Sequence, residues 1–420
     1  MKTLKHFFIT FVAVIPFLAC CQYNRGSLSL KNGKPTVGAE RLDYYLPLLK
    51  GKLVAVFANQ TSMVGKEHLV DVLLKNKVQV KKIFTPEHGF RGTADAGEHV
   101  SDDTDVKTGL PIVSLYGTHS KPTAEDLKDI EVIVFDIQDV GVRFYTYISS
   151  LEYLIEAAYE NNKHLIILDR PNPNGFYVDG PVLDKKFKSF IGMQPVPVVY
   201  GMTMGEYAQM ILYEQWIDLK NQYSTAGQQG NFELTVVTCN NYTHKTIYEL
   251  PVNPSPNLNS ITGIYWYPST CFFEGTVLSE GRGTPKPFQI FGHPSLPKNL
   301  FSFTPESNLG AKEPKLKGKL CYGWDISDTK ENVLNKINGR IQLSYLLNAY
   351  KLFPKKDSFF LPSKSGKPED YFFNKLAGNA TLMQQIKDGK SEDEIRKSWQ
   401  PDIQKFKAIR KKYLLYKDFE

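Results

Sequence analysis

Short apolar runs alternate with helix-like stretches through the first half of the 420-residue chain, and this rhythm limits the possible folds more than any other feature. Runs that are apolar throughout are typical of parallel strands buried on both faces, which are connected by crossover helices. We expect strands at residues 52–58, 80–84, 111–116, 132–137 and 164–169, and helices at 65–77, 123–130, 146–162 and 203–216. Thr203 and Glu206 form the pattern of a capping box at the start of the last helix.

The second part of the chain has a different composition. From about residue 260 it is rich in aromatic residues, glycine and proline, and it ends in a helix-like stretch at 393–416. We place the boundary in a proline-rich turn, so that residues 51–258 form an α/β domain with a parallel sheet and residues 259–420 a smaller mixed α+β domain. The final stretch carries an apolar face at helical spacing, formed by Ile395, Trp399, Ile403, Phe406 and Ile409.

The first residues predict export. Two lysines precede an apolar run at 7–18, which is shorter than the roughly 20 residues that cross a bilayer. Residues 1–21 are therefore a predicted signal peptide, and residues 22–50 a tether and entry segment. The residues ahead of Cys20 and Cys21 resemble a bacterial lipobox, so we expect a lipid on one of these cysteines and a membrane-anchored protein that faces the periplasm. A plain secretion signal is the alternative.

Several functional classes are disfavoured by composition and motifs. The formal charge of +7 falls to about +5 without the two signal lysines, and no basic cluster alternates with aromatic residues, so we expect no nucleic-acid partner. No G-x-G-x-x-G follows the first strand, and no G-x-x-x-x-G-K-[ST], G-x-S-x-G or H-E-x-x-H occurs. Beyond the signal, Cys239, Cys271 and Cys321 have no metal-like spacing and leave one disulfide possible. We therefore expect neither a cofactor nor a metal.

Polar residues follow each of the predicted strands. In a parallel sheet the carboxyl ends of the strands lie along one edge, and ligands bind beyond that edge. The residues concerned are Asn59, Gln60, Thr61, Glu87, His88, Tyr116, His119, Asp136, Gln138, Asp139, Arg143, Asp169, Arg170 and Asn172. Loops are polar in most proteins, so none of these residues is diagnostic alone. Together they predict a polar pocket that can hold many hydroxyl groups.

The segment FTPEHGFRGTADAG, residues 84–97, places Glu87, His88 and Arg91 on a glycine-rich turn after the second strand. Glycosidic cleavage commonly uses one carboxyl group to protonate the leaving oxygen and a second group to activate water or stabilise the cationic centre. Glu87 is thus a candidate acid, with His88 and Asp136 as candidate partners. The alternatives are a surface ion pair for Glu87, a structural hydrogen bond for His88 and a loop brace for Asp136.

A second polar cluster follows the domain boundary. The segment EGTVLSEGRGT, residues 274–284, carries Glu280 and Arg282 among glycines. An arginine fork suits a carboxylate ligand, so Arg282 is a candidate binding residue. An ion-pair loop between the domains is the alternative. Asn257, in the proline-rich turn, is a candidate donor to a ligand, although turn formation is the default explanation of this residue.

Six segments, TPEHGFRG, DIQDVGVRFYTY, LDRPNPNG, GMTMGEYA, NPSPNL and SEGRGT, look like the signature segments of the bacterial exo-β-N-acetylmuramidases of the NamZ type, a family of glycoside hydrolases. The resemblance runs in order from about residue 45 to the C-terminus. It implies a Rossmann-like N-terminal domain, a smaller C-terminal domain and a cleft between them. It also implies that Glu87 is the catalytic glutamate. The chain departs from the pattern at Val199 and Tyr200, where many relatives carry Arg-His, so its sugar preference differs if that pair contacts the substrate.

The resemblance implies removal of N-acetylmuramic acid from the non-reducing ends of peptidoglycan fragments. The lactyl carboxylate of this sugar suits Arg282 or Arg143, and a site built around such an arginine disfavours N-acetylglucosamine, which lacks that group. The 2-acetamido group offers an internal nucleophile, so substrate assistance is an alternative to a second carboxylate. The predicted sugar-binding residues are Asn59, Arg91, Arg143, Tyr145, Asp169, Arg170, Asn257, Glu280 and Arg282.

Two other functions compete with this hypothesis. The first is a periplasmic amino-sugar-binding lipoprotein without turnover, which has the same polar pocket. The second is an amidase or esterase that acts on the same fragments, against which the missing serine elbow and the missing metal spacing count. In all three hypotheses the partner is a peptidoglycan-derived amino sugar. The sequence leaves the oligomeric state open.

Overall fold

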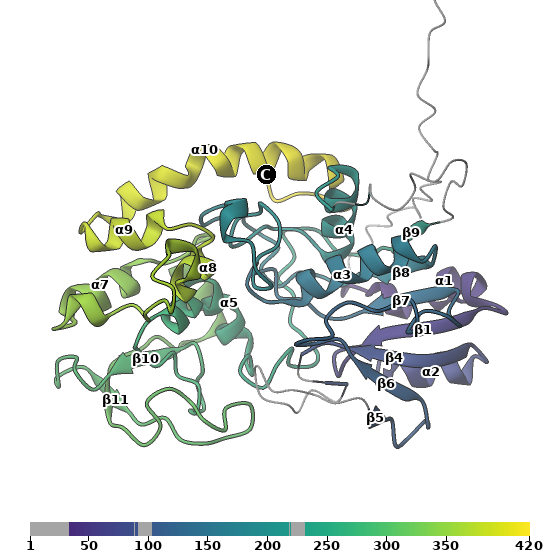
Figure 1. Ribbon diagram of the computed structural model, residues 1–420, viewed down its shortest axis with the longest axis horizontal. Coiled ribbons are helices and arrows are strands. Elements are labelled where there is room, and N and C mark those ends of the chain that lie inside the picture. The colour runs from purple at the N-terminus through teal and green to yellow at the C-terminus, as the bar shows by residue number, and fades with distance from the viewer. Residues whose placement is uncertain (1–32, 88, 91–102, 218, 220–231) are drawn as a thin grey trace, which may run out of the picture.

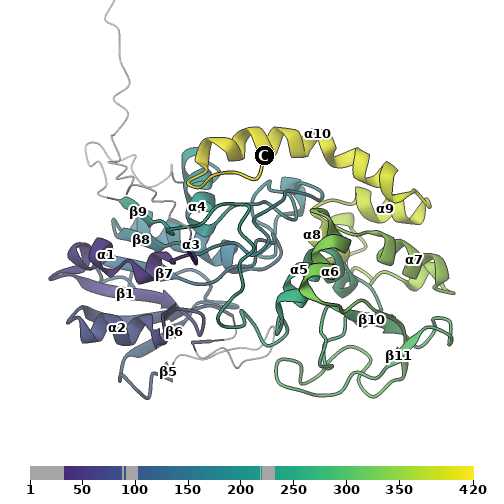
Figure 2. The same cartoon turned by 180° about the vertical axis from the view of Figure 1, so that it is seen from behind.

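The computed structural model describes residues 33–87, 89–90, 103–217, 219 and 232–420. Figure 1 shows a large sheet with its helices at one end of the molecule and a smaller sheet with further helices at the other. One long helix, α10 (Glu392–Arg410), runs across the top of both parts in this view, and Figure 2 shows the same arrangement from behind.

The large sheet has the strand order β5-β6-β4-β1-β7-β8-β9. The edge strand β5 is antiparallel to its neighbour, and the other six strands are all parallel. Its strands are β1 (Leu53–Ala58), β4 (Gln79–Thr85), β5 (Asp103–Thr104), β6 (Pro111–Ser114), β7 (Val132–Asp136), β8 (His164–Leu168) and β9 (Glu233–Val237). Counted along the chain, the parallel strands follow the order 3-2-1-4-5-6 of a Rossmann fold. The predicted fold class is therefore confirmed.

Helices cover both faces of this sheet, because its strands are apolar on both sides. Leu49 of α1 and Leu73 of α2 belong to the core on one face, and Leu151 of α3 and Tyr207 of α4 to the core on the other. The elements are η1 (Gly38–Glu40), α1 (Leu42–Leu49), a hairpin of β2 (Met63–Val64) and β3 (Glu67–His68), α2 (Leu69–Lys75), α3 (Tyr147–Glu160), η2 (Lys185–Phe187) and α4 (Met204–Tyr213).

The helix predicted at 123–130 is wrong, because this segment forms a series of turns. Thr123 and Asp126 bond to each other through side chains and backbone, as at a helix start. However, the next backbone bonds mix i+3 and i+4 partners, and β7 begins two residues after Ile130. The segment is therefore too short to propagate a helix after the costly first turn.

The second part of the molecule has a small antiparallel sheet of order β10-β12-β11. Its core is continuous with that of α3 and α4, because Leu151 and Trp399 belong to one apolar cluster. The elements are α5 (Ile261–Thr270), η3 (Cys271–Gly275), β10 (Ile290–His293), β11 (Phe301–Phe303), β12 (Cys321–Asp325), α6 (Lys330–Ile337), α7 (Ser344–Leu352), η4 (Lys356–Ser358), η5 (Pro368–Asp370), α8 (Phe372–Ala377), α9 (Thr381–Lys387), α10 and η6 (Lys411–Tyr413).

The helix predicted at 393–416 is present as α10, which ends earlier, at Arg410. Ile395, Trp399, Ile403 and Phe406 are buried, as the apolar pattern predicted. The last residues turn back onto the first part of the molecule, where the Tyr416 hydroxyl donates to Asp169. Within the part of the chain that the structure describes, no helix is long and apolar enough to cross a membrane.

Candidate active site

The strand order reverses between β1 and β7, which are neighbours in the sheet although three strands of the same sheet, β4, β5 and β6, lie between them in the sequence. In open α/β folds the loops on the two sides of such a switch point diverge and leave a crevice beyond the carboxyl ends of the strands. Asn59 and Gln60 follow β1 on one side, and Gln138 and Asp139 follow β7 on the other. The switch point therefore brings residues predicted from two strand ends to one place.

Glu87 lies beyond the end of β4 and is partly exposed. The Thr146 hydroxyl, at the start of α3, donates a 3.3 Å hydrogen bond to Glu87 Oε2. Tyr116, beyond β6, also lies beside this carboxylate, since burial and then the charge of Glu87 raise the pKa of Tyr116 above its ordinary value. Two hydroxyl groups thus lie beside a partly exposed carboxyl group, and a carboxyl group that a substrate can reach is able to deliver a proton to a leaving group.

Tyr145 and Tyr147 form an aromatic wall beside these residues, with ring centroids 4.6 Å apart. The Tyr145 hydroxyl donates to the carbonyl oxygen of Pro254 at 2.9 Å. Gln60 Nε2 donates to the same carbonyl at 3.1 Å. The proline-rich turn, which begins at Asn253, is therefore tied to the edge of the sheet, and the predicted sugar-binding residue Tyr145 is part of that connection.

Asn59, a predicted sugar-binding residue, is fully buried and uses both ends of its amide. Its Nδ2 donates to the Tyr147 hydroxyl at 2.9 Å, and its Oδ1 accepts from the backbone and side chain of Thr61. These contacts favour a role in holding Tyr147 rather than in binding a ligand directly.

Asp136 and Arg170 form a buried ion pair. Arg170 Nε and Nη2 lie 2.6 and 2.8 Å from the two carboxylate oxygens of Asp136, and Nη2 also donates to the carbonyl of Met63. Both side chains are almost inaccessible to solvent. This bidentate geometry leaves neither partner available to a substrate, so it supports a brace between the ends of β7 and β8 and does not support the roles predicted for these two residues.

Arg143 and Asp169 are also buried and committed to other groups. Arg143 donates to the carbonyl oxygens of Pro181, Val196 and Leu376 and so joins the two parts of the molecule. Asp169 accepts hydrogen bonds from Thr203, Gly205 and Tyr416. Burial raises the pKa of Asp169 to about 6, although these hydrogen bonds oppose the shift. Neither geometry supports the predicted contact with sugar.

The Asp139 carboxyl group, also on this edge, forms hydrogen bonds to described residues through only one of its two oxygens. Its Oδ2 accepts from the backbone N–H of Gly141 at 2.6 Å and from the Tyr200 hydroxyl at 2.5 Å. Its Oδ1 has no hydrogen-bond partner among the described residues. The sequence placed Asp139 on this edge as one of the carboxylates that could share it with Glu87, and Gln138 without a role of its own. The missing signal was strand order, which makes the loops after β1 and β7 neighbours.

The second predicted cluster is an ion-pair network. Arg282 Nη2 and Nε lie 2.6 and 3.0 Å from Glu274 Oε1, and Glu280 lies 3.6 Å from the same guanidinium. Lys315 pairs with Glu280 at 2.8 Å. Burial lowers the pKa of Arg282, but the two glutamates outweigh it and raise this pKa above its ordinary value. Arg282 is therefore charged and partly exposed, and a ligand carboxylate has to compete with Glu274 for it.

Aromatic rings connect this network to the edge of the sheet. The Arg282 guanidinium lies over the Phe288 ring, 5.1 Å from its centroid. Phe288 packs edge-on against Tyr267, with centroids 4.8 Å apart, and Tyr267 packs against Tyr145 at 6.2 Å. The two predicted clusters therefore belong to one region, although they come from different parts of the chain.

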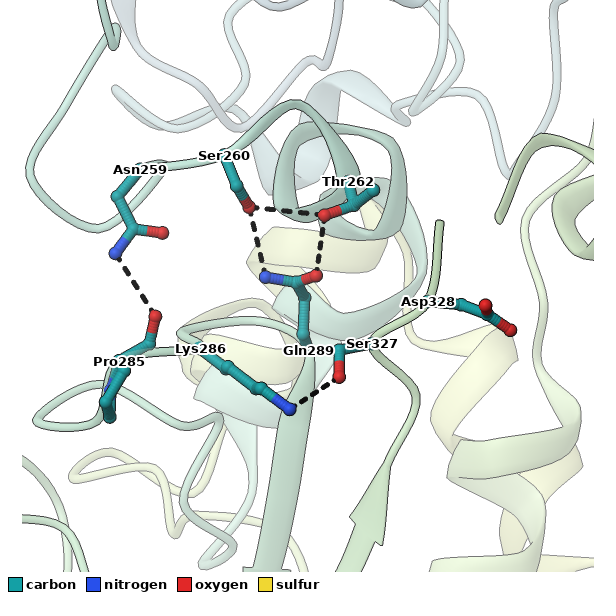
Figure 3. A pocket seen from close by; sticks show the side chains of 8 residues that line it. All are labelled: Asn259, Ser260, Thr262, Pro285, Lys286, Gln289, Ser327 and Asp328. Atoms are coloured by element: carbon teal, nitrogen blue, oxygen red, sulfur yellow. Dashed lines mark hydrogen bonds between the residues drawn. The ribbon is translucent and has the colours of Figure 1, made fainter. Parts of the chain in front are cut away.

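Asn257 and a nearby groove complete the polar features of this region. Asn257 Nδ2 donates to the carbonyl of Gly310 at 2.6 Å, which is consistent with turn formation. A groove of about 420 Å³ lies at the start of α5. Figure 3 shows its lining residues, among which Gln289 bonds to the hydroxyl groups of Ser260 and Thr262. The groove is lined by Asn259, Ser260, Thr262, Pro285, Lys286, Gln289, Ser327 and Asp328. None of these lining residues was predicted to bind a ligand.

Four predicted residues lie outside the described part of the chain: His88, Arg91, Cys20 and Cys21. Their predicted roles in catalysis, sugar binding and lipidation stay predictions. Cys239, Cys271 and Cys321 are buried and free. In the ranges that the structure describes, no group of three or more His, Cys, Asp or Glu side chains is arranged to hold a metal ion.

Comparison with known proteins bears on both parts of the chain. Residues 54–262 match the family model described as exo-β-N-acetylmuramidase NamZ, N-terminal, and residues 265–416 match its C-terminal counterpart. Peptidoglycan β-N-acetylmuramidase NamZ of Bacillus subtilis (strain 168) is 37% identical over 396 residues, which cover 89% of each chain. A crystal structure of a DUF1343 family protein from Bacteroides fragilis NCTC 9343 has a TM-score of 0.81 at 45% identity and covers 92% of this chain and 100% of its own. A second DUF1343 protein of that organism has a TM-score of 0.74 at 28% identity, covering 91% and 99%.

Proposed function

Because this chain belongs to the NamZ family of exo-β-N-acetylmuramidases, we propose that it is a glycoside hydrolase that releases N-acetylmuramic acid from the non-reducing ends of peptidoglycan fragments. The observation that carries the proposal is Glu87, a partly exposed carboxyl group at the carboxyl edge of a Rossmann sheet, beside the hydroxyl groups of Thr146 at the start of α3 and Tyr116 beyond β6. The family assignment supplies the reaction, and this geometry supplies the candidate acid.

Glu87 acts as the general acid in this proposal. In glycosidic cleavage the leaving oxygen needs a proton as the bond to the anomeric carbon breaks, because it otherwise departs as an anion. Thr146 and Tyr116 lie beside the Glu87 carboxyl group and can hold it in place for proton transfer to the leaving oxygen. Tyr145 and Tyr147, packed edge to face, form the buried aromatic backing of this place.

Arg282 recognises the lactyl carboxylate of the muramic sugar in this proposal. The aromatic path through Phe288 and Tyr267 to Tyr145 supports a substrate cleft shared by the two parts of the molecule. The guanidinium is already charged and is held by Glu274, so the substrate exchanges one carboxylate partner for another. A sugar without the lactyl group leaves the Arg282–Glu274 pair unchanged and gains no binding energy from Arg282.

The N-terminal sequence extends the proposal to location. Residues 1–21 have the pattern of a lipoprotein signal, with Cys20 or Cys21 as the acceptor of the lipid. Anchoring to a bacterial membrane on the periplasmic side brings the enzyme to the compartment where peptidoglycan fragments occur. Labelling of expressed protein with a radioactive fatty acid, lost when both cysteines are replaced by serine, tests this part.

The first experiment compares wild type with Glu87→Gln on two substrates. One is a disaccharide with N-acetylmuramic acid at its non-reducing end, and the other is the chromogenic β-glycoside of N-acetylmuramic acid. We expect Glu87→Gln to lower kcat/KM on the disaccharide by about 10²–10⁴-fold, the usual contribution of a general acid. The loss on the chromogenic glycoside is smaller, because its leaving group departs without protonation.

Controls separate the proposal from a binding protein. Glu125→Gln, which changes an exposed carboxylate, is the matched substitution and leaves both rates unchanged. The chromogenic β-glycoside of N-acetylglucosamine tests the role of the lactyl group and is a poor substrate. Equal losses on both muramic substrates would contradict the acid role of Glu87. Binding of N-acetylmuramic acid by a wild-type protein that hydrolyses neither substrate would leave the amino-sugar-binding function.

A further inference from the structure

Three buried oxygen atoms lie on the two loops that flank the switch point and accept no hydrogen bond from any described residue: Gln60 Oε1, Gln138 Oε1 and Asp139 Oδ1. The orientation of both glutamines is set by their Nε2 atoms, each of which donates to two backbone carbonyls. All three oxygens are acceptors. Buried polar atoms are almost always paired in folded proteins, so each of these oxygens is an open acceptor for an O–H or N–H donor of a ligand.

Asp139 differs from the two glutamines because it can also take a proton. Gly141 and Tyr200 hold its Oδ2, so the position of Oδ1 is set before a ligand arrives. Four tyrosines, Tyr145, Tyr147, Tyr200 and Tyr207, lie close enough for the charge of Asp139 to raise their pKa values. Burial raises the pKa of Asp139 itself to about 6, against the lowering effect of its hydrogen bonds.

Tyr147 relates Asp139 to the proposed acid. After burial, the charges of both Glu87 and Asp139 raise the pKa of the Tyr147 phenol. The two carboxyl groups therefore approach the same aromatic wall from different strand ends, β4 for Glu87 and β7 for Asp139. A proton donor and a second carboxylate close to one substrate position are the pair that glycosidic cleavage commonly uses.

We propose that Asp139 is the proton-accepting carboxylate of the site, whose Oδ1 binds the group that attacks the anomeric carbon. The proposal rests on the hydrolase function proposed above and assigns its second carboxyl group. Asp136, which the sequence offered for this role, is occupied by Arg170. Two groups can attack the anomeric carbon in this way, a water molecule and the 2-acetamido group of the substrate. Each attacks through its oxygen, and the O–H of the water or the N–H of the acetamido group becomes more acidic as that oxygen bonds to carbon.

If water attacks, its oxygen forms the new bond to the anomeric carbon and its proton passes to Asp139. The bond to the leaving oxygen breaks with its electron pair, and that oxygen takes the proton of Glu87. If the acetamido oxygen attacks instead, the N–H proton passes to Asp139 and a neutral oxazoline forms. Water then opens the oxazoline, giving one proton to Glu87 while Asp139 returns its own to nitrogen.

The test is the pH dependence of disaccharide hydrolysis by the full chain, with Tyr200→Phe as the decisive variant. A base acts only when ionised, so kcat/KM of wild type falls below about pH 6, the pKa of Asp139. Tyr200→Phe removes a donor that favours the ionised form. We expect the acidic limb of the profile to move upward by about one pH unit. Asp139→Asn lowers kcat by about 10²–10⁴-fold at all pH values.

Tyr207→Phe is the matched control. Its hydroxyl has no hydrogen-bond partner among the described residues, and its ring lies 5.7 Å from that of Tyr200. We expect the acidic limb of this variant to stay at the wild-type pH. The same protein samples are checked by thermal unfolding, so that a lower rate is not a folding defect.

The outcomes separate this inference from the function on which it rests. Wild type that hydrolyses the disaccharide with the same acidic limb in Tyr200→Phe overturns the role of Asp139 alone. Wild type that hydrolyses nothing overturns both. When the limb moves as expected, the anomer released first, read by NMR, identifies the attacking group: inversion indicates water, and retention indicates the acetamido group.

Discussion

Asp136 and Asp139 are three positions apart on one strand end, yet their surroundings differ. Asp136 uses both oxygens on the guanidinium of Arg170, whereas Asp139 uses one oxygen on neutral donors and leaves Oδ1 unpaired among the described residues. An arginine beside a carboxylate favours its ionised form, and burial beside neutral groups disfavours it. Residue type therefore does not identify the functional carboxylate, because its neighbours decide its chemistry.

The first prediction at the residue scale concerns the ion pair. We expect Asp136→Asn to lower the free energy of unfolding by about 3–5 kcal/mol, because it leaves the buried charge of Arg170 without a partner. Urea unfolding measures this change, and exposed Glu125→Gln is again the control, with no measurable effect. The rate per folded molecule stays near that of wild type. A folded Asp136→Asn protein without activity would instead support the catalytic role predicted from the sequence.

At the scale of elements, the start of α4 shows how a local motif acquires a tertiary role. The capping box expected from Thr203 and Glu206 is confirmed, with the Thr203 side chain accepting from Glu206 N. The same hydroxyl donates to Asp169 at 2.7 Å, and Glu206 also pairs with His244 at 3.0 Å. The cap therefore connects α4 to the end of β8 and to the segment that contains His244, as well as closing its own first turn.

This connection predicts that Thr203→Ala and Thr203→Ser have different effects on the free energy of unfolding. Thr203→Ala loses the cap and one buried hydrogen bond to Asp169, so we expect a loss of about 2 kcal/mol in the free energy of unfolding, the upper end for caps. Thr203→Ser keeps the hydroxyl group and stays within about 0.5 kcal/mol of wild type. Urea unfolding of the two variants side by side measures the difference. Equal losses in both would show that the methyl group, not the hydroxyl, is responsible.

At the scale of the whole molecule, the C-terminal tail joins the two parts. Arg410, at the end of α10, donates to the carbonyl of Gly201 and pairs with Asp418. Beyond it, the Tyr416 hydroxyl donates to Asp169 and accepts from the backbone N–H of Cys239. Figure 1 shows the C-terminus lying over the first part of the molecule, near α4. The predicted C-terminal domain therefore ends on its neighbour.

The contacts of the C-terminal tail give a prediction about the stability of the whole molecule. Tyr416→Phe leaves the buried Asp169 carboxylate without one donor, and we expect it to lower the free energy of unfolding by about 1–3 kcal/mol. Tyr413→Phe, which removes a more exposed hydroxyl bonded to Glu214, is the control and has a smaller effect. Removal of residues 411–420 is more damaging, because it also unpairs buried Arg410. Thermal unfolding measures all three, and an unchanged truncated chain would refute the structural role of the tail.

Much of the large sheet was predictable because strand formation there depends on local pattern. The expected strands at 52–58, 80–84 and 132–137 correspond to β1, β4 and β7, of which β1 and β7 are apolar over most of their length. Sequence reasoning did not identify β9, whose residues are mostly half-buried at the sheet edge, and it predicted a helix at 123–130 where turns occur. Both errors concern short segments in which tertiary contacts outweigh weak local preferences.

The sequence by itself determined the parallel sheet and the position of Glu87 at a strand end, because apolar periodicity and chain order are properties of neighbouring residues. Only the tertiary structure decided which loops meet. The strand order places β1 beside β7, and that contact brings Gln60 next to the loop of Asp139. Likewise, only folding pairs Asp136 with Arg170, 34 positions away, since side chains so distant in sequence find each other through packing.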